Sequence, residues 1–206
     1  MCNLYRMSQP QAEIARLFDA AEAGPAGNVP ELVFPGHPGL VVASGRGGVL
    51  QAGQMHWGFP LVLKGAKGQP LKPKPVNNAR SDHLASPFWR SSFVQRRCLI
   101  PLEAYAEAEG AKGARTRSWF SLPEQELFAC AGIWRNTEEW GVSFAMVITD
   151  ANQQASAVHD RMPVILRRED HQLWQHGTPE EAAALCRPWA GQMLLERTDQ
   201  PWAGRH

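Results

Sequence analysis

Cysteine is scarce in this sequence, and no two cysteines are spaced to bind one metal ion together. The four cysteines stand at positions 2, 98, 130 and 186, with no CxxC pair and no clustered Cys/His spacing. A structural zinc site needs ligands at short, regular spacings, so the pattern argues against one. We therefore expect no metal and no other cofactor, and four free thiols in a reducing cytoplasm.

Long hydrophobic runs are also missing. The chain turns polar soon after its start, in the stretch SQPQAE (8–13), and no segment is long and apolar enough to cross a membrane as a helix. The 206 residues suit one domain with a real core. The sequence therefore predicts no membrane partner.

The chain has no large excess of charge of either sign, but its charges are unevenly distributed. The formal net charge is +1, yet residues 61–97 carry +7 and the rest of the chain sums to −6. Such an asymmetry is typical of a surface that binds a polyanion, and it is equally compatible with solvated charges balanced in space. Only Asp82 opposes the basic residues of this stretch, which are Lys64, Lys67, Lys72, Lys74, Arg80, Arg90, Arg96 and Arg97.

Glycine and proline, by contrast, are abundant, with 18 and 16 residues, and they favour turns over a helical bundle. Seven apolar or alternating stretches predict short strands, too closely spaced for a regular βαβ alternation. We therefore predict an α+β single domain, with a mostly antiparallel, curved, barrel-like core sheet and a few flanking helices. The predicted strands are LVVAS (40–44), GVLQAGQMHWGF (48–59), RCLIPL (97–102), SWFSL (118–122), ELFACAGIW (126–134), GVSFAMVIT (141–149) and MPVILR (162–167).

Helices are predicted near both ends. The stretch 8–24 has apolar residues on one face, and Ser8 with Gln11 matches an N-terminal capping box. The stretch TPEEAAALC (178–186) starts with a threonine cap, a proline at the first helical position and a glutamate that closes the box.

Two further segments connect these elements. The basic segment 64–78 is expected to be an extended loop, because its prolines and glycines disfavour regular structure. The stretch 81–93 is a candidate short helix.

Cys2 is the first candidate functional residue. Removal of Met1, which aminopeptidases generally perform before small side chains, leaves Cys2 with a free α-amine and a thiol on adjacent carbons. Such a group reacts with aldehydes in a way that no internal cysteine can. A Met-Cys start also arises by accident, so the motif alone leaves its meaning open.

Polar residues also stand at two strand boundaries. NNARSD (77–82) places Asn78 near Arg80; an amide can hold a thiol or a backbone, and a guanidinium can bind phosphate. The alternative is a polar turn that leads into a helix. His159 and Arg161 precede an apolar strand, and histidine is the usual proton shuttle near neutral pH, although a structural histidine is the alternative.

Carboxylates and a tryptophan complete the candidates. RCLIPLEAYAEAEG (97–110) ends in Glu103, Glu107 and Glu109. A glutamate just past a buried strand can have a raised pKa suited to proton transfer, or can be a surface acid. Trp57 ends a strand, where it can stack on a nucleobase or fill the core.

A set of short motifs follows in a fixed order along nearly the whole chain. These are Cys at position 2, a WG strand end, NAR, RCLIP with a glutamate six residues after its proline, AGIW, FAMVIT and H-x-RMPVIL. Together they resemble the SOS-response-associated peptidase (SRAP) domain family, whose members sense abasic sites in single-stranded DNA and cross-link to them. The resemblance runs from Cys2 to about Leu195, so we expect a domain at 2–195 and a C-terminal tail at 196–206.

The resemblance implies a set of catalytic residues. Cys2, exposed by removal of Met1, is expected to be the nucleophile that forms a thiazolidine cross-link with the abasic-site aldehyde. Asn78 is expected to position it. Glu107 and His159 are expected to transfer protons.

The resemblance also implies the partner. Arg80, Arg161 and Trp57 are expected to contact DNA, and Lys72 and Lys74 of the basic segment to hold its phosphates. The partner is then single-stranded DNA that contains abasic sites, bound by a monomer in the bacterial cytoplasm, at the nucleoid.

The chain departs from the family pattern at two places. Many members begin MCGR, with an arginine at the fourth position that contributes a phosphate contact, whereas this chain opens MCNLY, has Leu4 there and has its first arginine at Arg6. The aromatic GWYEW-like stretch around the glutamate is AYAEA here, which leaves only Tyr105. These changes affect the expected DNA contacts more than the catalytic set.

Three alternatives remain. Cys2 can act as a thiol peptidase nucleophile with His159 as its base, although only Met1 precedes it as a segment to cut in cis. The chain can be a single-stranded-DNA-binding module with an inert site. A zinc-dependent nucleic-acid protein is a third, which lacks the ligand spacing.

Overall fold

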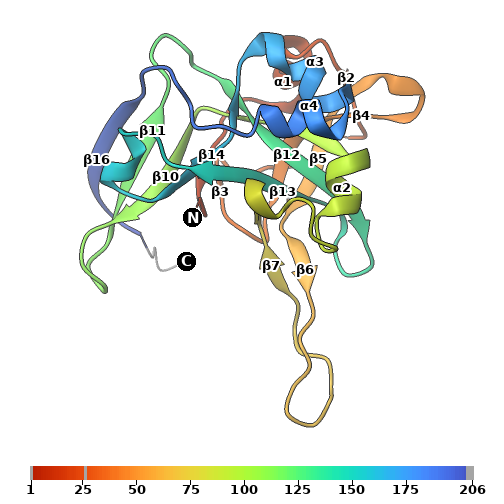
Figure 1. Ribbon diagram of the computed structural model, residues 1–206, viewed down its shortest axis with the longest axis horizontal. Helices are drawn as coiled ribbons and strands as arrows, with labels where there is room; N and C mark the ends of the chain where they lie inside the picture. Colours follow the sequence, from red (N-terminus) through yellow and green to blue (C-terminus); the bar gives the residue numbers. More distant parts are fainter. Residues whose placement is uncertain (1, 26, 203–206) are drawn as a thin grey trace.

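The computed structural model describes residues 2–25 and 27–202, and its centre is a barrel-like sheet (Figure 1). Five strands form it: β4 (Pro38–Ser44), β5 (Leu50–Trp57), β9 (Arg97–Leu102), β12 (Phe128–Thr137) and β13 (Gly141–Asp150). Neighbours pair antiparallel in the order β13-β12-β9-β4-β5, and β5 also pairs parallel with β13, so the five strands close on themselves. The apolar residues of these strands fill the interior, and the predicted α+β fold with a barrel-like core is confirmed.

Four short strands extend this sheet. They are β2 (Ala21–Glu22), β8 (Asn78–Arg80), β14 (Arg161–Pro163) and β15 (Ile165–Leu166). β8 and β14 pair with β13, β15 pairs with β12, and β2 pairs with β5. β8 runs parallel to β13, with Arg80 opposite Ile148, and β14 runs antiparallel to it, with Arg161 opposite Asp150. The NAR motif and the residues after His159 therefore flank the same end of one strand.

A second sheet, at the left of Figure 1, packs beside the barrel. Its order is β16-β11-β10-β1-β3. The strands are β1 (Tyr5–Arg6), β3 (Leu32–Val33), β10 (Ala104–Glu109), β11 (Thr116–Ser121) and β16 (Leu194–Pro201).

Residues 196–201 of the expected tail belong to β16, which continues to Pro201 and pairs with β11. The stretch is mostly polar and exposed, as suits an edge strand whose pairing uses backbone groups rather than a buried face. Residues 203–206 lie outside the described part of the chain.

The basic segment is an arm that projects from the body, at the bottom of Figure 1. Its base is a two-stranded sheet of β6 (Phe59–Leu61) and β7 (Lys74–Val76), and an isolated bridge joins Lys64 to Pro70. The prediction of an extended loop without regular structure is therefore wrong at Lys74–Val76 and at the bridge between Lys64 and Pro70. Pro60 lies directly opposite Pro75, and such a pair fits an antiparallel ladder where no inter-strand N–H is needed.

The helices are short and cover the outside of the barrel (Figure 1). The first begins at Gln11 rather than 8, because the Ser8 backbone N–H donates to Glu103 Oε1 at 2.9 Å instead of opening a helix, and Pro10 is the N-cap. The predicted capping box at Thr178 is confirmed. The helices are α1 (Gln11–Leu17), α2 (Arg90–Gln95), α3 (His171–His176) and α4 (Pro179–Ala184), with 3-10 turns at Arg46–Gly48, Ser81–His83, Ala155–Ala157 and Arg168–Asp170. In the stretch 81–93 the expected helix is thus a 3-10 turn followed by the start of α2. No helix of the described residues is long and apolar enough to cross a membrane.

Candidate functional site

The first strand brings the start of the chain to Glu107. Tyr5 pairs with Tyr105 on β10, and the carbonyl of Leu4 accepts a hydrogen bond from the backbone N–H of Ala106 at 2.9 Å. This register carries Cys2 toward Glu107. Both side chains are only 2% exposed.

The Cys2 thiol is protonated near neutral pH. Burial raises its pKa far above the usual value for a thiol, and the nearby Glu107 carboxylate raises it further. The Sγ atom lies 3.7 Å from the carbonyl oxygen of Leu4, to which it donates.

Two side-chain amides hold the backbone of Cys2. Asn78 Nδ2 donates to the Cys2 carbonyl oxygen at 2.7 Å, and Asn77 Nδ2 donates to the same oxygen at 3.1 Å. Asn77 Nδ2 also lies 3.0 Å from Asn3 Oδ1. The NAR motif pointed to Asn78 but not to Asn77, whose only signal in the sequence is the doubled asparagine of NNAR.

Trp57 supports this amide pair from inside the core. Its indole is fully buried, 5.0 Å from Tyr5 and 6.3 Å from Phe144 between ring centres. Its Nε1 donates to the backbone carbonyl of Asn77 at 3.2 Å. Of the two interpretations for Trp57, the structure therefore contradicts the DNA contact and supports the core residue, because no ring face is exposed to a nucleobase.

Glu107 differs from the other two carboxylates of its stretch. Burial raises the pKa of Glu107 to about 7, and the Asp160 carboxylate adds to the effect. Glu103, by contrast, accepts hydrogen bonds from Ser8. Hydrogen bonds from Ser118 and then Arg197 lower the pKa of Glu109. Glu107 is therefore poised to gain and lose a proton near neutral pH, and Glu109 is not.

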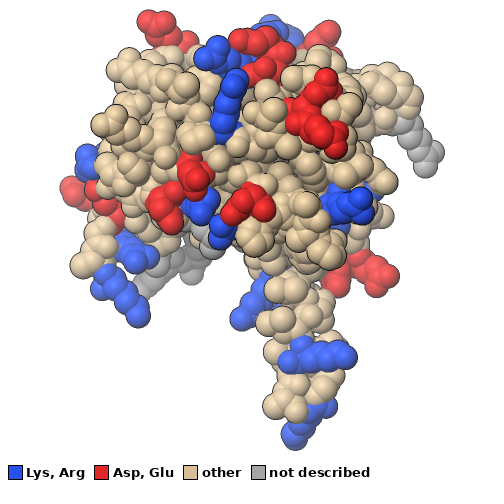
Figure 2. All heavy atoms as spheres, viewed as in Figure 1, with Lys and Arg blue, Asp and Glu red and all other residues tan. Residues whose placement is uncertain are grey.

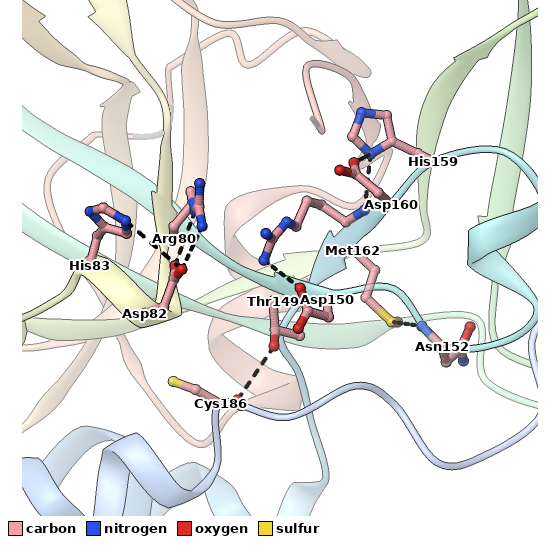
Figure 3. A network of polar contacts seen from close by, with 11 residues as sticks. Arg80, Asp82, His83, Thr149, Asp150, Asn152, His159, Asp160, Met162 and Cys186 are labelled. Carbon is pink, nitrogen blue, oxygen red and sulfur yellow. Dashed lines mark hydrogen bonds and ion pairs between the residues drawn. The ribbon is translucent and has the colours of Figure 1, made fainter.

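His159 lies two residues before β14, next to Asp160 (Figure 3). Its Nδ1 accepts a hydrogen bond from the backbone N–H of Arg161 at 3.0 Å and lies 2.9 Å from an Asp160 carboxylate oxygen. Partial burial lowers its pKa despite that carboxylate. When the ring is neutral and its proton is on Nε2, Nδ1 accepts the hydrogen bond from the Arg161 backbone N–H. When the ring is protonated, Nδ1 carries a proton and donates to Asp160 instead.

Several of these residues meet at one cavity of about 460 Å³. Asn3, Glu107 and His159 line it; Cys2 is the chain neighbour of Asn3 and is close enough to Glu107 for that carboxylate to raise the pKa of its thiol. Arg115 and Trp202, which sequence analysis did not single out, line the same cavity. The structure thus brings the four predicted catalytic residues into one neighbourhood.

The two predicted DNA-contact arginines both hold carboxylates. Arg80 makes two hydrogen bonds to Asp82, at 3.0 and 2.5 Å (Figure 3), and Arg161 lies 2.5 Å from Asp150. A phosphate at either guanidinium therefore has to compete with an aspartate.

The arm carries an uncompensated positive charge. Lys72 and Lys74 are exposed, and Figure 2 shows basic side chains spaced along the arm below the body. Residues 59–76 contain no Asp or Glu. Within residues 2–25 and 27–202 no ion pair involves a lysine of the arm. The part of the chain that the structure describes also holds no group of three His, Cys, Asp or Glu placed to bind a metal ion.

Comparison with known sequences gives one family and named relatives. Residues 1–198 match the family described as SOS response associated peptidase (SRAP). The abasic site processing protein YoqW of Bacillus subtilis is 30% identical over 146 residues, which cover 66% of this chain and 64% of YoqW. The abasic site processing protein YoaM of the same organism is 23% identical over 201 residues, 92% of this chain and 86% of YoaM. The chain thus spans less than two thirds of YoqW and most of YoaM.

Solved structures share the fold. A Bordetella bronchiseptica protein matches with a TM-score of 0.78 and 20% identity, over 96% of this chain and 99% of that one. A Bacteroides thetaiotaomicron protein matches with a TM-score of 0.77 and 19% identity, over 95% of this chain and 91% of that one.

Proposed function

Because this chain belongs to the SRAP family, we propose that it processes abasic sites in single-stranded DNA by forming a covalent cross-link through Cys2. The relatives YoqW and YoaM are named abasic site processing proteins. The observation that carries the proposal is the position of Cys2: two amides fix its carbonyl beside a buried carboxylate with a pKa of about 7. Met1, whose removal the proposal requires, lies outside the described residues.

The chemistry begins at the Cys2 amine. An α-amine has a reference pKa of about 8, so part of it is unprotonated at neutral pH and attacks the carbon of the open-chain sugar aldehyde. The aldehyde oxygen leaves as water, which gives a Schiff base. The Sγ atom then bonds to the same carbon, the thiol gives up its proton and the nitrogen keeps one of its two amine protons, so the net reaction joins protein and DNA with loss of one water.

Glu107 and His159 move the protons of these steps. Glu107, with a pKa of about 7, protonates the departing oxygen and then accepts the proton of the buried thiol. Neutral His159, which lines the same cavity, takes part in opening the sugar ring. Asn78, and with it Asn77, keeps the amine and thiol in the geometry of ring closure, which gains from enforced proximity.

The protonated thiol favours this order of events over a thiol peptidase. A peptidase nucleophile is the thiolate, which lies next to a base that stabilises it. Here burial and the Glu107 carboxylate both raise the pKa of Cys2, so the amine is the better first nucleophile. Peptidase activity is therefore the second candidate, carried only by the family description.

In this proposal the protein binds DNA through its phosphates and does not recognise the base sequence. Lys72 and Lys74 on the arm supply phosphate contacts, as do Arg80 and Arg161 beside β13. We propose that the protein acts as a monomer on nucleoid DNA in the bacterial cytoplasm. The uncompensated charge of the arm supports a polyanion partner over a balanced surface.

The test is the mass of the intact protein after incubation with a uracil-containing single strand, with and without prior uracil excision. We expect an adduct of protein plus strand minus one water, only after excision and only from protein that lacks Met1. Cys2→Ser should lose the adduct and keep its affinity for the strand. An absence of adduct from correctly processed protein contradicts the proposal, and cleavage of peptides by that protein would then favour the peptidase.

A further inference from the structure

The cavity is also lined by two segments that the proposed chemistry does not use. Arg115 lies on the connection between β10 and β11, and Trp202 lies just past the end of β16. The backbone N–H of Trp202 donates to the carbonyl oxygen of Arg115 at 2.8 Å. This hydrogen bond holds the two side chains at one edge of the cavity.

The guanidinium of Arg115 is available to a ligand. Its side chain is exposed, and among the residues that the structure describes it has no ion pair, hydrogen bond or ring contact. Glu109, the half-buried acid of the same cavity, is already bound by Arg197 at 3.0 Å and by Ser118. A guanidinium that faces a cavity without a carboxylate partner is suited to an anion from outside.

Arg117, two residues further along the chain, shows the contrast. Its side chain is buried and lies over the Phe34 ring, 5.9 Å from the ring centre. It is used within the fold, whereas Arg115 is not.

Trp202 combines a fixed position with access to the cavity. It packs, half-buried, against a small apolar cluster that contains Leu4, Ala106 and Trp119. It also lines the cavity that Glu107 lines. An indole that is anchored on one side and reachable on the other is a stacking platform for a nucleobase.

We infer that Arg115 and Trp202 form a subsite for the nucleotide that neighbours the reacting abasic nucleotide. This inference rests on the proposed function. Arg115 binds the phosphate between the two nucleotides. Trp202 stacks on the neighbouring base, since the abasic nucleotide itself has no base to offer.

The subsite accounts for strand binding near the catalytic carboxylate. Leu4 is fully buried in the apolar cluster and supplies no charge there. Arg115 carries a permanent positive charge, whereas Asn3, Glu107 and His159 of the same cavity do not. The strand is thereby held on the Glu107 side of the cavity, while Arg80 and Arg161 stand at β13.

The test measures cross-linking rates of Arg115→Gln and Trp202→Ala on a strand with one abasic site. We expect each variant to be about tenfold slower at subsaturating DNA, which is about 1.4 kcal/mol. Arg168→Gln, an exposed arginine beside α3, is the matched control and should keep the wild-type rate. Trp202→Phe keeps an aromatic ring and should remain within about threefold of wild type, with the same Tm.

A second set of DNA strands distinguishes a loss of base stacking from a loss of the folded structure. Each strand carries a base-free tetrahydrofuran residue on the 5′ or the 3′ side of the abasic site. On the strand that lacks the stacked base, wild-type protein should slow to the rate of Trp202→Ala, and Trp202→Ala should slow no further. Equal effects of Trp202→Ala on every strand, or wild-type rates for both variants, overturn the inference.

The two proposals fail differently. If wild-type protein forms no cross-link, the proposed function is wrong. The subsite is then judged by the affinity of Cys2→Ser protein for an undamaged single strand, with and without Arg115→Gln and Trp202→Ala. Unchanged affinity in both variants rejects the subsite as well.

Discussion

The side chains of Asn77 and Asn78 donate to one and the same acceptor, the carbonyl oxygen of Cys2. Two consecutive residues of an extended strand normally point to opposite faces. Here Asn77 lies just before β8, and its own carbonyl is held by Trp57 and by the backbone N–H of Met146. The two amides therefore form a clamp on the residue that carries the proposed nucleophiles.

We predict that Asn77→Ala and Asn78→Ala each slow cross-linking about tenfold, because each variant removes one donor from a buried carbonyl. The DNA concentration that gives half the maximal rate should change less than twofold, since neither amide is proposed to contact DNA. Single-turnover kinetics over a range of DNA concentrations checks both. Asn136→Ala, an exposed asparagine on β12, is the control. An unchanged maximal rate in Asn77→Ala would falsify the clamp.

Glu107 should make stability depend on pH. Its pKa is raised from 4.5 to about 7 by burial, so the folded state holds the proton more tightly than the unfolded state. The stability that this provides is complete below pH 4.5 and is lost as pH rises through 7. Relative to wild type, Glu107→Gln should gain up to about 3 kcal/mol in unfolding free energy between pH 4.5 and 8.

Urea titrations at pH 5 and 8 measure this difference. Glu109→Gln is the control: the pKa of Glu109 is lowered from 4.5, so its contribution is lost only at more acidic pH, and the difference between this variant and wild type should stay constant between pH 5 and 8. A constant difference between Glu107→Gln and wild type across this range contradicts the raised pKa.

Trp57→Phe should separate core support from DNA binding. The substitution keeps a buried ring and removes the N–H that donates to Asn77, so we expect a stability loss of about 1–3 kcal/mol and slower cross-linking. Affinity for a single strand, measured by fluorescence anisotropy in the Cys2→Ser background, should stay within twofold. A large loss of affinity at unchanged Tm restores Trp57 as a DNA contact.

Asp82→Asn should strengthen DNA binding. Asp82 holds the guanidinium of Arg80, and its removal frees that group for a phosphate. We expect a two- to fivefold higher affinity at low salt, with a smaller gain at high salt, since exposed charges are screened. Glu169→Gln removes the same charge beside Arg167 and should have no such effect. Equal gains from both variants point to net charge alone.

The strands of the barrel follow closely from the sequence. FACAGIW and FAMVIT are apolar on both faces because β12 and β13 are buried on both sides, and a continuous apolar run predicts such a strand. The polar strand β16 carries no such signal, since its pairing with β11 is made by backbone groups. The N-terminal helix was predicted to start too early, because Ser8 bonds Glu103, which lies far along the chain.

At the candidate site, too, some features follow from the sequence and others only from the tertiary structure. The sequence alone determined which chemistries are present: an amine and thiol at Cys2, an amide at Asn78, a carboxyl at Glu107 and an imidazole at His159. Tertiary structure decided which of them meet, and it added Asn77, Arg115 and Trp202. It also decided that Glu107 titrates near pH 7 while Glu109 does not, and that Trp57 lies in the core. The physical reason is that burial and hydrogen bonding are set by neighbours in space, and these neighbours come from strands that stand far apart in the sequence.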